Sequence, residues 1–382
     1  MVFGIIKSSL WNIEAEDFVV TEDDYKEMKA HAITALPASI LSRISVPIDT
    51  KEKWQRDILH QIAYNVNCRY VESRIPISVP YLILKGTSAA QYYPHPEYRT
   101  LGDIDIITRR EDFDTAYQEL LDNGYRVVKE LDREIGLAKN GVMIELHHRF
   151  ALLNAPIRSK YLDDIILENI NPTHVLPDLV NGLVLIEHIN QHLEGGLGLR
   201  HIIDWMMFVN KCLTDDHWPA FYDMVEKIGL GKLSIVCTRM CEIYLGLSEH
   251  SWCIDADSIL CQDLMDYVLS CGNFGNKKTS DADIVENAFA YASTPKMVFQ
   301  LLQKRGLANW KAAQKYKFLK PFAWIYQAFR YASRGLRRDE ATVRLKDEYN
   351  NAKRRNAMFE ALGVKTAAKG RVIYKNGEYI KV

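Results

Sequence analysis

The sequence predicts an α+β protein in which a small mixed β-sheet unit is joined to a larger all-helical domain and a C-terminal β-hairpin. Short apolar runs separated by turn residues are confined to residues 80–150 and 371–382, and apolar residues at helical spacing fill most of the remaining chain. The length of 382 residues is enough for two or three domains. Hydrophobic residues make up 48% and charged residues 25%, which excludes disordered and collagen-like classes.

Targeting signals and disulfide patterns are absent from the sequence. No apolar run approaches the ~18 residues of a membrane span, and the first residues contain no long apolar segment of the signal-peptide type. The 7 cysteines are odd in number and none are spaced as CxxC. We therefore expect a cytoplasmic protein with free, mostly buried thiols.

The N-terminal 75 residues are expected to form a helical layer. Residues 8–42 and 51–71 are rich in helix formers, with apolar side chains at helical spacing. Pro76 and Pro80 then close the segment. The sequence thus predicts a first region over residues 1–75.

A small α/β core is predicted over residues 76–160. Tyr81 to Leu84 is an apolar run too short for a helix, and residues 102–108 alternate with the period of a strand. A helix is expected from Glu111 to Asn123, followed by a strand over 125–128. The pair Asn140-Gly141 predicts a hairpin turn before another strand over 142–147.

A helical domain over 161–340 and a basic tail over 341–382 complete the predicted organisation. Helical periodicity covers 178–192, 199–213, 218–246, 256–271, 283–303 and 321–337. In the tail, Asn376-Gly377 lies between two β-prone runs and predicts a hairpin over 371–382.

Charge is distributed unevenly along the chain. Residues 304–382 carry 20 Lys and Arg against 6 Asp and Glu, whereas residues 1–303 carry 28 against 43. Over 304–338 the basic residues alternate with aromatic ones, a mixture that suits an anionic membrane surface, a nucleic acid or a nucleotide-binding wall. Helices with aromatic cores and solvated basic faces, or docking against the acidic part of the chain, remain open alternatives.

A pair of aspartates carries the clearest chemical signal. Asp103 and Asp105 are two residues apart on a predicted strand, so we expect both carboxylates on one face. At ~5 Å and an effective dielectric near 20 their repulsion is about 3 kcal/mol, which favours a bound cation. Oxygen ligands indicate Mg²⁺ or Mn²⁺. Glu145 offers a third carboxylate from another strand if its face of the sheet turns toward this pair.

A turn upstream strengthens this interpretation. The first strand ends in Lys85-Gly86-Thr87-Ser88, and Ala89-Ala90-Gln91 then starts a helix. Backbone N–H groups at a helix start, together with two hydroxyls, suit a phosphate chain.

The segment LKGTSAAQYYPHPEYRTLGDIDIIT, with VMIELHHRF after it, resembles the DNA polymerase β-type nucleotidyltransferase superfamily and, more narrowly, a bacterial family of uncharacterised nucleotidyltransferases. The motifs cover residues 80–150, and a weaker likeness continues through GLGLRHIIDW and GNFGNK. The resemblance implies a polymerase β-like core in which Asp103, Asp105 and Glu145 are catalytic and bind Mg²⁺ or Mn²⁺. It also implies that Gly86, Thr87 and Ser88 hold the phosphates of an NTP.

Two features depart from the superfamily pattern. Lys85 stands where glycine is frequent, which adds a phosphate-binding cation, and 14 residues separate Ser88 from Asp103, more than the usual short spacer. Arg99, just before the aspartates, is a candidate phosphate clamp, with a surface ion pair as the alternative.

Two other motifs resemble ligand sites. His188 and His192 lie four residues apart on a predicted helix, but they do not form HExxH and the sequence indicates no third ligand for zinc. Gly195-Gly196-Leu197-Gly198 lacks the Lys-Ser/Thr of a P-loop and is expected to be a turn between helices. Arg200 and Asp204 are one helical turn apart and are expected to pair with each other or to face the cleft.

The function expected from the sequence is Mg²⁺-dependent transfer of an NMP from an NTP to a hydroxyl acceptor, which is a sugar, small molecule, protein or RNA. Two alternatives belong to other classes. One is a nucleotide-binding regulatory protein without turnover, and the other is a membrane-peripheral component of a glycan-assembly system that contacts the membrane through 304–338.

Overall fold

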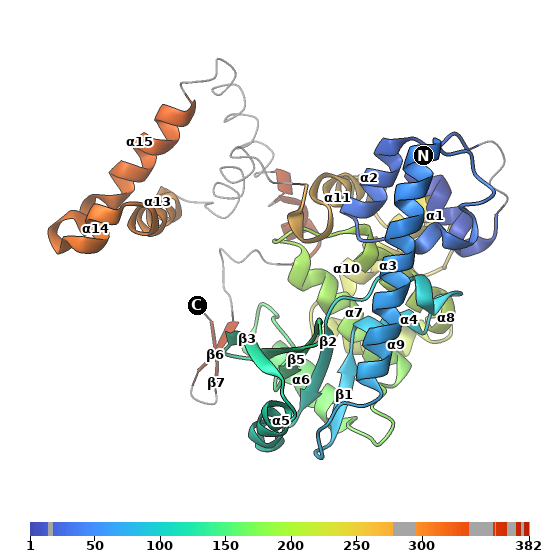
Figure 1. The fold of residues 1–382 in the computed structure, drawn as a ribbon, viewed down its shortest axis with the longest axis horizontal. Coiled ribbons are helices and arrows are strands. Elements are labelled where there is room, and N and C mark those ends of the chain that lie inside the picture. The colour runs from blue at the N-terminus through green and yellow to red at the C-terminus, as the bar shows by residue number, and fades with distance from the viewer. Residues whose placement is uncertain are drawn as a thin grey trace. The chain divides into compact units, whose positions relative to one another are not determined.

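The computed structural model of the protein describes residues 1–13, 18–277, 295–335, 354–355, 357–364, 372–375 and 378–381. The chain divides into two compact units (Figure 1). The first comprises Met1–Lys277 and Val372–Val382, and the second comprises Lys278–Arg371. The α+β class predicted from the sequence is confirmed, because one mixed sheet and many helices make up the structure.

A five-stranded sheet is the centre of the first unit. Its strands are β1 (Tyr81–Leu84), β2 (Ile104–Thr108), β3 (Arg126–Leu131), β4 (Glu134–Lys139) and β5 (Val142–His147), in the spatial order β1-β2-β5-β4-β3. Strands β2 and β5 are parallel, and every other pair is antiparallel. Asn140 and Gly141 join β4 to β5 with φ angles of 50° and 78°, so the predicted hairpin turn is present.

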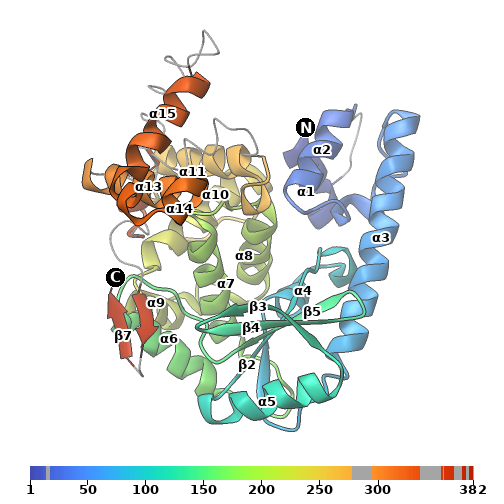
Figure 2. The same cartoon turned by 60° about the vertical axis from the view of Figure 1, so that its left-hand side comes forward.

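The two faces of the sheet have different chemistry. On one face, α5 (Arg110–Asp122) buries Phe113, Ala116 and Leu120 in an apolar core with the even-numbered residues of β2 and β5. Successive residues of a strand point to opposite faces, so Asp105 and Glu145 point away from that core. Helix α7 (Asp178–His192) covers the polar face, as Figure 2 shows.

Helices supply the rest of the first unit. Before the sheet come α1 (Val2–Trp11), α2 (Glu22–Ala30) and α3 (Ile48–Glu72), and a short helix α4 (Gly86–Ala90) follows β1. Thr21 caps α2 and forms a capping box with Asp24. After the sheet come α6 (Pro156–Glu168), α7, α8 (Leu199–Cys212), α9 (Trp218–Lys227), α10 (Gly231–Leu245) and α11 (Ser258–Cys271).

One predicted helix is divided in two. The sequence predicts a helix over 218–246, but the chain breaks between α9 and α10 at Gly229, whose φ is 75°. The Leu230 N–H binds the Val225 carbonyl and the Gly229 N–H binds the Glu226 carbonyl, which is the Schellman ending of a helix. Apolar spacing continues across the break, so periodicity alone does not reveal it.

The C-terminal hairpin contains β6 (Val372–Lys375) and β7 (Glu378–Lys381), which pair antiparallel as predicted. Its turn, Asn376-Gly377, lies outside the described residues. Strand β7 lies beside α6 (Figure 2).

The second unit contains α13 (Pro295–Asn309), α14 (Lys311–Lys315) and α15 (Ala323–Gly335). Helices α13 and α15 pack together, and the rings of Trp310 and Tyr326 stack with centroids 5.0 Å apart. The first part of the helix predicted over 283–303 lies outside the described residues. Among the helices that the structure describes, none is both long and apolar enough to span a membrane. All seven cysteines are free.

Candidate active site

The polar face of the sheet carries an acidic cluster. Strands β2 and β5 run parallel in a register that sets Asp105 beside Glu145. Asp103 lies in the chain just before β2, rather than within the strand as the sequence predicted. Both Asp105 and Glu145 are buried, at 2% and 6% exposure. Strands β2 and β5, together with the residue just before β2, therefore bring three carboxylates together.

Asp105 is bonded to two basic side chains. The Lys85 ammonium lies 2.6 Å from Oδ1 of Asp105, and Nε2 of His147 donates to the same oxygen over 3.0 Å. Lys85 immediately follows β1 and has a φ of 50°, in the left-handed region that non-glycine residues rarely adopt. This backbone conformation turns the chain from β1 into α4.

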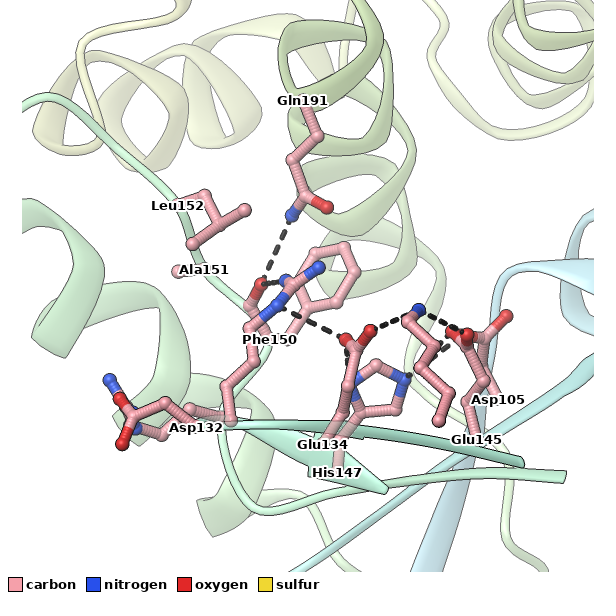
Figure 3. Close-up of polar contacts among 12 residues, drawn as sticks. Asp105, Asp132, Glu134, Glu145, His147, Phe150, Ala151, Leu152 and Gln191 are labelled. Carbon is pink, nitrogen blue, oxygen red and sulfur yellow. Dashed lines mark hydrogen bonds and ion pairs between the residues drawn. The ribbon is translucent and has the colours of Figure 1, made fainter. Parts of the chain in front are cut away.

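Glu145 has a different set of neighbours. The Lys129 ammonium on β3 donates to Oε1 of Glu145 over 2.7 Å and also to Glu134 on β4. Nδ1 of His147 lies 3.3 Å from Oε2 of Glu134, so the imidazole stands between two carboxylates. Figure 3 shows Asp105, Glu145, Glu134 and His147 rising from one face of the sheet toward Gln191 of α7.

The three carboxyl groups differ in acidity. Burial raises the pKa of Asp105, but Lys85 and His147 outweigh it, and the net pKa lies well below the usual value. Burial raises the pKa of Asp103, and repulsion from Asp105 raises it further. The pKa of Glu145 is raised by burial and then by Asp105 and Asp103, against the opposing effect of Lys129. Asp105 is therefore a stable anion, whereas burial and the nearby carboxylates disfavour the charged forms of Asp103 and Glu145.

The turn after β1 lies next to these carboxylates. Gly86 has a φ of +25°, and a Cβ at this position would lie 3.6 Å from the Asp103 carbonyl oxygen. The Thr87 hydroxyl donates to Glu72 of α3, and the Ser88 hydroxyl is buried and finds no hydrogen-bond partner in the part of the chain that the structure describes. A small pocket is lined by Glu72, Gly86, Thr87, Asp103 and Asp105, among others.

Residues 25–246 match a protein family described as uncharacterised nucleotidyltransferase, which is more than half of the chain. The chain belongs to this family. No curated protein and no solved structure matches it. The matched region of this nucleotidyltransferase includes the whole five-stranded sheet and helices α7 and α8.

Most residues singled out from the sequence of the nucleotidyltransferase lie together. Lys85, Asp103, Asp105 and Glu145 form one cluster, and the turn with Gly86, Thr87 and Ser88 adjoins it.

Arg99 is engaged elsewhere. Its Nε and Nη2 donate to the two carboxylate oxygens of Asp204 over 3.0 and 2.6 Å, and its Nη1 donates to the Thr100 carbonyl. The Tyr93 hydroxyl also donates to Asp204, over 2.7 Å. Arg99 is thus a buried link between the segment before β2 and helix α8. Asp204 pairs with Arg99 and not with Arg200, so the ion pair, one of the two arrangements expected for Arg200 and Asp204, is not formed.

Three participants were not assigned a role from the sequence. Glu134 and Lys129 lie on β4 and β3, whose partners in the sheet depend on register, and His147 lies at the end of β5, two residues after Glu145. The signal was present in the alternation of β5, since Glu145 and His147 share a face two residues apart. The pairing of Glu134 with His147 across β4 and β5 adds the fourth acid.

Proposed function

We propose that this protein transfers an NMP from an NTP to a hydroxyl acceptor and releases pyrophosphate, with Mg²⁺ or Mn²⁺ at the acidic cluster. The observation that carries the proposal is the register of β2 and β5, which sets Asp105 beside Glu145 next to the Lys85–Ser88 turn. Membership of the nucleotidyltransferase family supports the general reaction class.

The donor set fits a hard divalent cation. Asp103, Asp105 and Glu145 offer carboxylate oxygens, which Mg²⁺ and Mn²⁺ prefer. Ligand atoms of Asp105, Glu145 and His147 lie within 4.8 Å of one another. Because His147 already donates to Asp105, we assign metal binding to the three carboxylates and orientation of Asp105 to His147. A bound Mg²⁺ would neutralise the carboxylates and stabilise charge on the triphosphate during in-line displacement.

The turn after β1 is suited to the phosphates. Lys85 contributes a buried positive charge at its start, and Gly86 and Thr87 line the pocket next to Asp103 and Asp105. The Ser88 hydroxyl has no hydrogen-bond partner among the described residues, which leaves it available to a phosphate oxygen. Arg99 is proposed to position α8 against the core instead of clamping a phosphate.

Glu145 is the proposed general base. Its carboxylate belongs to the same cluster as Asp103 and Asp105, so it can accept a proton from a hydroxyl bound at that cluster. In the reaction the acceptor oxygen bonds to the α-phosphorus as the bond from that phosphorus to the β-phosphate oxygen breaks. The acceptor proton passes to Glu145, and pyrophosphate leaves with the electron pair of the broken bond.

A labelling experiment tests this proposal. The purified protein is incubated with Mg²⁺, a cell extract and an NTP labelled on either the α- or the γ-phosphate. We expect an acceptor to gain label from the α-position only, and we expect Asp105→Asn to abolish the transfer while the exposed control Asp114→Asn retains it. Transfer from the γ-position would overturn the proposal, since it indicates a kinase. Metal-dependent NTP binding without any transfer would favour the regulatory alternative.

A second candidate, contact with an anionic membrane, rests on the second unit. Phe318, Phe322 and Phe329 are exposed at 71%, 53% and 74%, and exposed Lys317 and Lys320 lie between or beside them in the chain. Exposed aromatic and basic side chains together suit a lipid surface. Co-sedimentation with anionic vesicles that is lost in the double variant Phe318→Ser/Phe329→Ser would support this contact, and equal sedimentation of both proteins would exclude it.

A further inference from the structure

Three histidines meet beside the acidic cluster. His188 and His192 lie one turn apart on α7, and His201 lies on α8. The centroids of the three imidazole rings are 4.7 Å apart in every pair. One ring nitrogen from each lies within 4.8 Å of the other two. The sequence indicated no third ligand for the first two, and the structure provides it through the fold of the 193–198 turn.

Glycines in that turn allow the close approach. Gly196 has a φ of +114°, and a Cβ there would lie 2.1 Å from the Gly275 nitrogen. A Cβ on Gly198 would lie 2.8 Å from Asn273. The turn between α7 and α8 is therefore locked against the 273–275 segment, and the Phe274 ring in that segment contacts His192 and His201 with centroids 4.9 and 5.8 Å away.

The histidines lack the partners that buried histidines normally have. His201 is 1% exposed and His188 is 7% exposed. Among the described residues, neither ring nitrogen of His201 has a hydrogen-bond partner of acceptable geometry, although the Gly198 carbonyl is close enough to act on its pKa. Buried polar groups in proteins are almost always paired, so an unpaired imidazole facing two others points to a missing ligand.

The protonation state is the one that a metal requires. Burial lowers the pKa of His192 to about 3 and places the pKa of His188 and His201 well below the usual value. All three rings are therefore neutral at pH 7 and keep a lone pair.

Charged groups near the histidines act in both directions. Lys85 and Arg200 oppose positive charge on His192, whereas Asp105 favours it. Lys85 is paired with Asp105, which offsets its charge. Arg200 forms no ion pair among the described contacts, although Asp204 and Asp103 partly offset its charge.

We propose that His188, His192 and His201 bind a Zn²⁺ ion, in a site separate from the acidic cluster. Imidazole nitrogens suit Zn²⁺, whereas they are poor ligands for the hard cations expected at Asp105. Three protein ligands leave a fourth position of the tetrahedron for water or an anionic ligand. Nitrogens of a tetrahedral zinc site are about 3.3 Å apart, given Zn–N distances of about 2.0–2.1 Å, so small rotations of the three rings close the site.

Zinc titration of the full-length protein tests the proposal. The protein is stripped with EDTA, returned to metal-free buffer at neutral pH and titrated with Zn²⁺ against a competing chelator. We expect an affinity that falls at least about 100-fold in His192→Gln, because even outer-shell changes at zinc sites cost 10–100-fold. His192 is chosen because it is less buried than His201, and circular dichroism checks its fold.

A matched variant separates this site from other histidines. His95→Gln, at an exposed histidine, is expected to retain wild-type Zn²⁺ affinity. Equal affinity of wild type and His192→Gln, no Zn²⁺ binding by wild type, or an equal loss in His95→Gln and His192→Gln would each overturn the proposal.

X-ray absorption of the wild-type Zn²⁺ complex provides a test that needs no variant. We expect the spectrum to show the multiple-scattering pattern of three imidazoles around the zinc ion. A coordination shell of oxygen ligands without imidazole would contradict the site.

Discussion

The acidic cluster and the three-histidine cluster differ in how they manage buried polar groups. Asp105 is held by Lys85 and His147, so removing one member leaves a buried charge without its partner. The histidines are neutral, and the described contacts give them ring packing instead of hydrogen bonds. Opposite charges stabilise the acidic cluster, whereas the packing of α7 and α8 holds the three-histidine cluster. We therefore expect the two clusters to respond differently to mutation, pH and metals.

The largest expected effect is on the activity of Asp105→Asn. Asn cannot provide an anionic metal ligand, so we expect NMP transfer to fall at least about 10³-fold, equivalent to about 4 kcal/mol of transition-state free energy. The measurement is the initial rate with α-labelled NTP and Mg²⁺. Activity within tenfold of wild type would remove Asp105 from the metal site.

The second effect concerns the stability of the metal-free protein. Asp105→Asn leaves Lys85 buried without its partner, and we expect a loss of about 3 kcal/mol or more in the free energy of unfolding. His192→Gln removes no hydrogen bond that the described contacts show, so we expect less than about 1 kcal/mol. Urea unfolding in EDTA compares the two. Equal losses would mean that the clusters are not stabilised in different ways.

A third variant, Asp103→Asn, sharpens the comparison within the acidic cluster. The raised pKa of Asp103 means that its charge is disfavoured in the folded protein, so the wild type loses stability as pH rises through that pKa. The Asn side chain resembles the neutral form of Asp103, so the variant does not lose stability as the pH rises through that pKa. We expect the metal-free variant to be more stable than wild type at pH 7, with a difference that shrinks toward pH 4. A destabilised variant at pH 7 would contradict the assigned repulsion.

Glu187 is a buried carboxyl group that forms no ion pair among the described contacts. Burial raises its pKa to about 7, against hydrogen bonds from the Leu152 N–H, Asn190 and Gln191. Since the folded pKa exceeds the unfolded value, stability is present at low pH and is lost as pH rises through about 7. We expect the metal-free wild type to lose about 1 kcal/mol between pH 6 and 8 and Glu187→Gln to lose much less. An equal loss in both proteins would show that another group titrates.

Local sequence patterns predicted the parts of the site that adjoin one another in the chain. The strand before Lys85 is a short apolar run, the residues around Asp105 alternate, and the strand with Glu145 follows a hairpin turn; the structure confirms all three strands. Repulsion between Asp103 and Asp105 was also anticipated, but the sequence did not show that Lys85 and His147 hold Asp105 as an anion. That pairing depends on the left-handed turn at Lys85 and on the parallel register of β5.

Local sequence patterns could not predict contacts between residues that are far apart in the chain. Arg99 and Asp204 are 105 residues apart, and their pairing requires α8 to pack beside the segment before β2. His201 joins His188 and His192 only because Gly196 and Gly198 permit a tight reversal against the 273–275 segment. The segments GLGLRHIIDW and GNFGNK contain Asp204, His201, both glycines and residues 273–275. Their likeness to the family therefore pointed to these positions, although it did not explain their geometry.

Anomalous diffraction from crystals soaked with Mn²⁺, Zn²⁺ and a non-hydrolysable NTP tests most directly the claim that the two clusters select different metals. Data collected at the Mn and Zn absorption edges identify each ion by element. The account predicts Mn²⁺ at the carboxylates of Asp105 and Glu145 beside the triphosphate, and Zn²⁺ among His188, His192 and His201. Absence of a Mn²⁺ peak at the carboxylates in a nucleotide-bound crystal, or Zn²⁺ at the carboxylates with none at the histidines, would contradict it.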